Sequence, residues 1–148
     1  MSIHTELVKI EERKISTEKA ANFIYSDLHG AQSIFVGRVR NENNGKKVKA
    51  VTYDVHEQMV IKSFKSICNT AKNKIDSNSR IFLEHAIGYV PQGEISIIIA
   101  VACSHRAEAY DLSRYIIEEI KKKSPIWKKE HYNNKDGEWL KGNPIQTN

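Results

Sequence analysis

Residues 94–103, EISIIIAVAC, form the most apolar stretch of the chain, and Ser104-His105-Arg106 follows directly. Isoleucine and valine fill the stretch on both alternating faces, which predicts a strand buried on both sides in the middle of a sheet. The apolar positions that follow recur with the 3.6-residue period of a helix: Ala109, Leu112, Tyr115, Ile116 and Ile120. We therefore expect a helix that begins near Arg106, with Ser104 as its N-cap, and that ends at Pro125.

Upstream of this stretch, the chain opens with a short alternating segment around Val8 and Ile10 that predicts a first strand. Ser16 is suited to cap a helix, because its hydroxyl oxygen can accept a backbone N–H of the first turn. An apolar stripe that includes Leu28 predicts that this helix continues to Gly30, where glycine is a common terminator.

Residues 33–40 are rich in β-formers and predict a second strand. Asn43-Asn44-Gly45-Lys46 follows, and Asn-Gly predicts a type I′ hairpin turn because these residues accept positive φ angles. Residues 48–55 alternate as the return strand, and residues 57–75 carry apolar side chains at helical spacing.

The second half of the chain adds a strand over residues 80–87, ahead of the central strand. Asn133-Asn134-Lys135-Asp136-Gly137 predicts a turn near the end. The predicted fold class is α+β, with an antiparallel or mixed β-sheet, hairpins and about three helices.

The bulk composition describes one ordinary domain spanning residues 1–148, with a tail from about residue 133 that we expect to be flexible. The apolar stretch is far shorter than the roughly 20 residues of a membrane-spanning helix. The charged N-terminus lacks the apolar core of a secretory signal, so we expect a cytoplasmic protein without a membrane association. The net charge of +5 indicates an anionic partner without identifying its kind.

Cys68 and Cys103 do not have the spacing of a disulfide framework or a metal site, so we predict two buried thiols and no metal. We also expect no cofactor.

Two basic clusters flank the strands. Arg38 and Arg40 are two residues apart, so they project from one face at a strand end. His105 and Arg106 stand at the start of a helix, where free backbone N–H groups and the helix dipole favour an anion. A cation at this position opposes the dipole, which favours a functional role for Arg106 over a merely stabilising one.

A third cluster, residues 121–129, has the sequence KKKSPIWKK. Lysines in a last helical turn can simply complement the dipole. However, a lysine held against the apolar pair Ile126-Trp127 and near other cations has a lowered pKa, which makes it a usable nucleophile or proton carrier. Lys121 lies before Pro125 and Lys128 after it, so the two side chains can converge on a pocket.

Taken in order, these segments resemble the large subunit of molybdopterin synthase. The matching segments are Phe35-Val36-Gly37-Arg38-Val39-Arg40-Asn41, Ser104-His105-Arg106 and the K-x-x-x-P-x-W-K pattern from Lys121 to Lys128, with support from His85-Ala86-Ile87-Gly88, Gly93-Glu94 and Trp139. They cover nearly the whole chain. The resemblance implies an α/β hammerhead-like fold.

The resemblance also implies a reaction and a site. A small ubiquitin-like subunit brings sulfur as a thiocarboxylate on its C-terminal Gly-Gly tail, and cyclic pyranopterin monophosphate receives it to form a dithiolene. Lys121 and Lys128 are then the catalytic lysines, and Arg40, His105 and Arg106 bind the pterin and its phosphate. Arg38 and Lys141 are additional candidates. The family's assembly implies a homodimer within a heterotetramer, with each site shared between two chains.

Two other functions fit the residues less well. A basic module that binds nucleic acid needs aromatic residues among the charges, and Trp127 is the only candidate inside a cluster, so we expect no nucleic-acid partner. A cysteine-dependent sulfurtransferase would use Cys103 with His105, and relatives commonly carry a small non-thiol residue at the position of Cys103.

Overall fold

The computed structural model describes residues 1–133 and 135–139, and in this part the chain forms eight strands and three helices. The sheet is mixed, because β1 pairs with β5 in parallel whereas the other pairs are antiparallel. The predicted α+β class is confirmed. In chain order the elements are β1 (Ile3–Lys9), α1 (Thr17–Ile24), β2 (Ala31–Arg38), β3 (Glu42–Asn43), β4 (Lys46–Val55), α2 (Glu57–Ile75), β5 (Arg80–Pro91), β6 (Ile95–Cys103), α3 (Arg106–Lys123), β7 (Ile126–Tyr132) and β8 (Lys135–Trp139).

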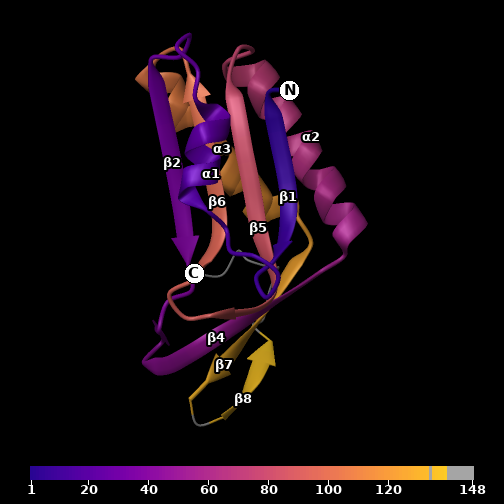
Figure 1. Cartoon of the computed structure of the whole chain (residues 1–148). Helices are drawn as coiled ribbons and strands as arrows, with labels where there is room; N and C mark the ends of the chain where they lie inside the picture. The colour runs from indigo at the N-terminus through magenta and orange to yellow at the C-terminus, as the bar shows by residue number, and fades with distance from the viewer. Residues whose placement is uncertain (134, 140–148) are drawn as a thin grey trace.

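Strand β6 lies between β2 and β5 in the middle of the main sheet, as its composition predicted. Residues 96–103 are all buried. Helix α1 covers one face of this sheet, where Phe23 meets Phe82, and α2 covers the other, where Phe64 meets His85 (Figure 1). Helix α3 packs beside α2 and against β6.

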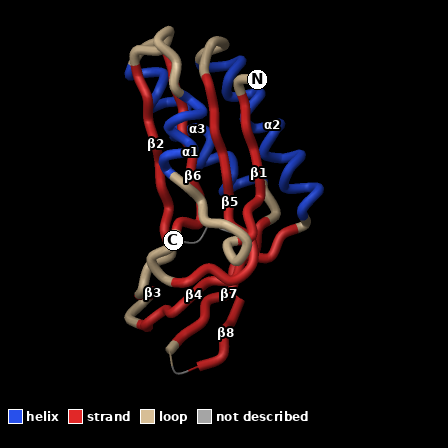
Figure 2. Tube along the Cα trace, in the orientation of Figure 1, coloured by secondary structure: helices blue, strands red, loops and turns tan. Residues whose placement is uncertain are grey.

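The long strand β5 connects two parts of the sheet. Its first part pairs with β1 and β6, and its end pairs with β4, where Tyr53 lies opposite Gly88. Gly88 has a φ of +84°, which a residue with a side chain rarely adopts, so the strand changes course there. As a result β4, β7 and β8 extend across the lower end of the main sheet (Figure 2).

Several predicted local features are confirmed. The Ser16 hydroxyl accepts the N–H of Lys19 at 3.1 Å, as an N-cap does. Asn44 and Gly45 have φ angles of 52° and 78°, which close the tight turn between β3 and β4.

Several local predictions were wrong, including the end of the strand predicted over residues 80–87, which continues to Pro91 as β5. Helix α1 ends at Ile24, because the Ser26 hydroxyl accepts the N–H of Leu28 and forms a local turn, which leaves Leu28 exposed. Strand β4 is not a return strand for β2; after the short β3 pairing it pairs with β5 and β7. The N-cap of α3 is His105 and not Ser104, whose backbone N–H donates to Asp76 Oδ2 at 3.0 Å.

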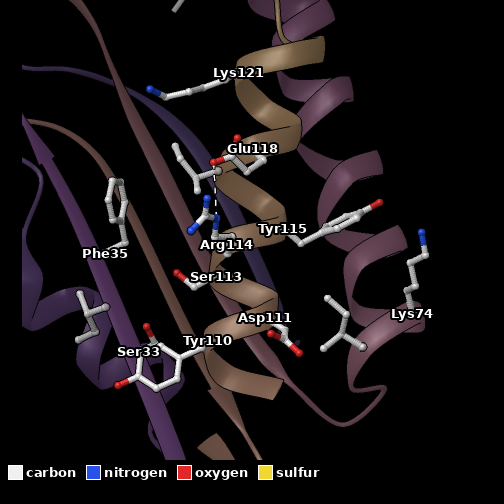
Figure 3. A pocket seen from close by; sticks show the side chains of 13 residues that line it. Ser33, Phe35, Lys74, Tyr110, Asp111, Ser113, Arg114, Tyr115, Glu118 and Lys121 are labelled. Atoms are coloured by element: carbon white, nitrogen blue, oxygen red, sulfur yellow. Dashed lines mark ion pairs between the residues drawn. The ribbon is translucent and has the colours of Figure 1, made fainter. Parts of the chain in front are cut away.

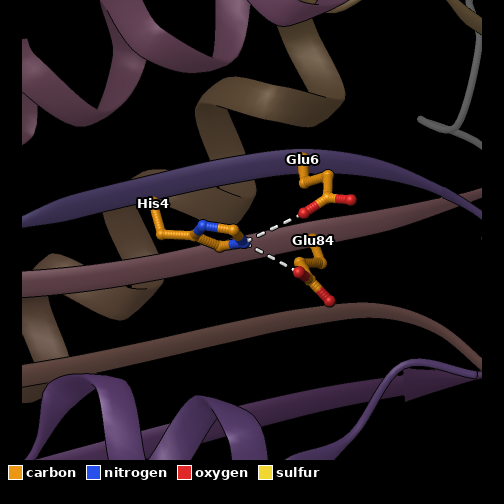
Figure 4. Close-up of side chains that lie close together, drawn as sticks. All are labelled: His4, Glu6 and Glu84. Atoms are coloured by element: carbon orange, nitrogen blue, oxygen red, sulfur yellow. Dashed lines mark hydrogen bonds and ion pairs between the residues drawn. The ribbon is translucent and has the colours of Figure 1, made fainter.

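A buried carboxylate joins the first residues of the chain to β5. Glu84 is fully buried and accepts hydrogen bonds from Arg13 Nη2 at 2.8 Å and His4 Nε2 at 2.7 Å. Figure 4 shows one ring nitrogen of His4 directed toward both Glu84 and the nearby Glu6. Lys19 Nζ lies 3.5 Å from Glu84, so α1, β1 and β5 meet around one negative charge.

The end of the chain is only partly described. Residues 135–139 form strand β8, which pairs with β7. Residue 134 and residues 140–148 lie outside the described part, so the flexible tail stays a prediction. Among the described helices, none has both the length and the apolar character needed to cross a membrane.

Candidate functional site

Two lysines from different elements line one small cavity. Lys121 comes from the last turns of α3 and Lys128 from β7, and the cavity has a volume of about 200 Å³. The chain reverses between them because Ser124 ends α3, and its hydroxyl lies 2.9 Å from that of Ser63 on α2. The other lining residues are Phe35, Gly37, Arg38, Tyr53, His85, Ser96, Ile97 and Ile117. The predicted convergence of the two lysines is thus present within one chain.

The surroundings of Lys128 favour its neutral amine. Burial lowers the pKa of Lys128, and the positive charges of Lys121 and Arg40 lower it further, while the negative charge of Glu130 opposes them. An amine with a lowered pKa is a better nucleophile and proton acceptor near neutral pH. The interpretation of this lysine drawn from the sequence is consistent with its position.

Glu130 is a buried carboxylate on β7, and it lines a second cavity together with Lys128. Asn43 Nδ2 donates to both of its oxygens, at 3.0 and 2.9 Å, and the Tyr132 hydroxyl donates at 2.8 Å. These bonds hold the carboxylate in place two residues beyond Lys128. The sequence did not predict Glu130 as a site residue. The one feature that could have indicated it is an acidic residue standing alone in a basic segment.

The two arginines reach an adjoining cavity of about 400 Å³. Arg38 and Arg40 line it together with Asn43, Lys128 and Glu130. Arg38 Nη1 also donates to the carbonyl oxygen of Gly93 at 2.7 Å, which fixes its guanidinium. Both predicted arginines therefore lie beside Lys128, in surroundings suited to an anion.

His105 and Arg106 lie elsewhere in the same chain. They stand exposed at the start of α3, and Lys121 follows Arg106 by 15 residues along the helix. At a rise of 1.5 Å per residue this places the two ends about 22 Å apart. A single chain therefore does not bring Arg106 to the lysine cavity. Lys141, the other predicted candidate, lies outside the described residues.

The buried cysteines are poor nucleophiles. Cys103 is fully buried on β6, and burial raises the pKa of its thiol to about 12. Burial likewise raises the pKa of Cys68 to about 12. Since the thiolate is the reactive form, this geometry argues against the cysteine-dependent alternative.

A larger groove of about 1050 Å³ runs between β2 and α3 (Figure 3). Its floor includes the partly exposed apolar side chains of Ile34 and Phe35 on β2. Tyr110 lies at one end of the groove and Lys121 at the other. Lys121 and Phe35 line both the groove and the lysine cavity.

The same fold occurs in a solved molybdopterin synthase structure. The chain superimposes on molybdopterin synthase from Staphylococcus aureus with a TM-score of 0.84 and 31% identity, covering 93% of this chain and 96% of that one. It also matches a chain in the protein–protein complex of subunits 1 and 2 of molybdopterin-converting factor from Helicobacter pylori, with a TM-score of 0.69, 26% identity, and coverage of 97% and 91%. These matches define the class as a molybdopterin synthase fold.

The sequence comparisons identify the family within that class. The MoaE protein family model matches residues 10–123. The chain is 35% identical to the molybdopterin synthase catalytic subunit of Synechococcus elongatus, over 92% of this chain and 82% of that protein. It is 37% identical to the catalytic subunit of Taeniopygia guttata, over 86% and 82%. The chain belongs to the MoaE protein family, and it is an enzyme subunit with a molybdopterin synthase role in molybdenum cofactor biosynthesis.

Proposed function

We propose that this chain transfers sulfur from the thiocarboxylated C-terminal Gly-Gly tail of a small ubiquitin-like subunit to cyclic pyranopterin monophosphate, forming the molybdopterin dithiolene. The observation that carries the proposal is the convergence of Lys121 and Lys128 on one cavity, next to two arginines. Such a site supplies an amine for nucleophilic or proton-transfer chemistry and fixed cations for a phosphate.

In this proposal the residues divide into two groups. Lys121 and Lys128 act at the reacting atoms, and the lowered pKa of Lys128 supports that role. Arg40 binds the pterin phosphate from the adjoining cavity, and Arg38 is a further candidate there. The buried Glu130 balances part of the positive charge beside Lys128.

One relative supports the proposed small-subunit partner. The Helicobacter pylori match is a complex of two subunits, which supports a small-subunit partner for this chain. The separation of Arg106 from Lys121 along α3 supports a site completed by His105 and Arg106 of a second copy. The proposed assembly is a homodimer of this chain within a heterotetramer.

Reconstitution tests the reaction. The purified chain is mixed with a thiocarboxylated small subunit and cyclic pyranopterin monophosphate, and the dithiolene product is measured. We expect product only when all three components are present. The same assay with Cys103→Ala separates the cysteine mechanism from the lysine mechanism, because only the former predicts loss of all turnover. A complete mixture of folded components that yields no dithiolene would contradict the proposed function.

A further inference from the structure

His85 is a buried histidine in the wall of the lysine cavity, on β5, and only 2% of it is exposed. Its ring meets the Tyr53 ring edge-on, with centroids 4.9 Å apart, and lies 6.4 Å from the ring of Phe64 on α2. Tyr53 is in turn the cross-strand neighbour of Lys128. The side chain is thus held in one place next to the proposed catalytic lysines.

The tautomer of His85 follows from its one hydrogen bond. Nδ1 lies 2.7 Å from the carbonyl oxygen of Ala86, and a carbonyl oxygen only accepts, so Nδ1 carries the proton. In a neutral imidazole, Nε2 is then an acceptor with a free lone pair. Among the described residues, the structure shows no hydrogen bond to this Nε2.

The imidazole stays neutral under ordinary conditions. Burial lowers the pKa of His85 to about 4, and the positive charge of Lys128 contributes to the lowering, against the opposing effect of the Ala86 hydrogen bond. The other titratable or charged side chains that line the cavity are Arg38, Tyr53, Lys121 and Lys128. Arg38, Lys121 and Lys128 are basic, and a positive charge nearby disfavours a charged imidazolium.

We propose that His85 is a positioning residue for the lysine pair, and that its Nε2 accepts a hydrogen bond from the amino group of Lys128 inside the cavity. A carboxylate at this place would attract the ammonium form and raise the pKa of the lysine. A neutral imidazole orients the amino group without adding a negative charge, so it raises the pKa of Lys128 less than a carboxylate would. The assignment rests on the proposed function only for the claim that Lys128 is catalytic.

Three substitutions separate the acceptor from the rest of the ring. His85→Gln places an amide near the position of Nε2 and keeps an acceptor there. His85→Asn places its amide near Nδ1, so it can keep the bond to Ala86 but has no acceptor toward Lys128. His85→Phe keeps a ring for packing and has neither group.

The readout is the reactivity of Lys128 in the intact protein. Competitive acetylation with acetic anhydride over a pH series, measured by peptide mass spectrometry, gives its titration midpoint, and exposed Lys65 serves as the internal control. In the Asn and Phe variants the ammonium of Lys128 loses its hydrogen-bond acceptor. The titration midpoint of Lys128 should then fall by about one pH unit, and turnover should be about tenfold lower. The Gln variant should remain close to the original protein in both measurements.

Two outcomes overturn the assignment. One is an unchanged Lys128 midpoint in whichever of the Asn and Phe variants folds. The other is an equal shift in the Asn and Gln variants, which would indicate a purely structural residue. Lys128→Ala distinguishes this failure from failure of the proposed function. Normal turnover in a Lys128→Ala protein would show that Lys128 is not catalytic, whatever effect His85 has on its titration midpoint.

Discussion

Lys121 and Lys128 line the same cavity, although Pro125 lies between them and they belong to a helix and a strand. The reversal at Ser124 turns the chain back, and pairing of β7 with β4 places Lys128 opposite Tyr53. The site therefore depends on the corner between α3 and β7 as much as on the lysines themselves.

Lys121→Ala should nearly abolish sulfur transfer and leave the fold intact. Alanine is well tolerated in a last helical turn, so any stability change should be small. Dithiolene formation and thermal unfolding are measured on the same preparation. Lys122→Ala is the matched control, since Lys122 is an exposed neighbour whose ammonium lies 4.0 Å from Glu119. Near-normal turnover by a folded Lys121→Ala protein would remove the residue from the proposed mechanism.

Arg40→Ala and Arg106→Ala should each weaken binding of the pterin precursor. A lost charge-assisted contact to phosphate is worth roughly 1.5–3 kcal/mol, or about ten- to a hundredfold in affinity. Equilibrium binding of the precursor to the assembled enzyme measures the effect. Lys65→Ala removes the same charge from an exposed position on α2 and should bind normally. Unchanged affinity in both arginine variants would place the phosphate elsewhere.

A mixture of inactive Lys121→Ala and inactive Arg106→Ala chains should regain activity if the site is shared between two copies. A heterodimer then carries both lesions in one site and none in the other. With unbiased exchange, heterodimers are half of all dimers and have one intact site of two, so about a quarter of the original activity should return. No recovery, with subunit exchange shown independently, would mean that each chain forms its own complete site.

The Glu84 cluster should make the fold sensitive to acid. Burial disfavours the carboxylate, but hydrogen bonds from Arg13 and His4 outweigh it and hold the pKa of Glu84 below its ordinary value of 4.5. The stabilisation is therefore complete above that value, and it is lost as the pH falls through the lower pKa of the folded state. Urea unfolding at a series of pH values measures this loss.

Glu84→Gln should remove this contribution at neutral pH. Loss of one partner from a buried ion pair costs roughly 3–5 kcal/mol, and we expect the lower end because Arg13 is partly exposed. Below the titration of Glu84 the variant and the original protein should become similar in stability. A Glu84→Gln protein that loses stability in acid as steeply as the original would show that other groups cause the acid sensitivity. Glu6→Gln is the matched control, because Glu6 is partly exposed.

The sequence by itself predicted the three helices and the strands β1, β2, β4, β5 and β6, but not β7 or β8. Hydrophobic periodicity predicted α2 over its full length and β6 as a buried central strand, because burial of apolar surface follows the geometric period of each element. Asn44-Gly45 predicted its turn, since few other residues accept positive φ angles. The ordered motifs also indicated the family and the two lysines.

Only the tertiary structure decided which side chains meet. The partners of β4 could not be predicted, because strand pairing depends on packing between distant segments and not on local propensity. His85 and Glu130 join the lysine site through such pairing, and neither stood out as a site residue in the sequence. The length of α3 separates Arg106 from Lys121 within one chain. A helix is rigid, so residues at its two ends can share a site only across two chains.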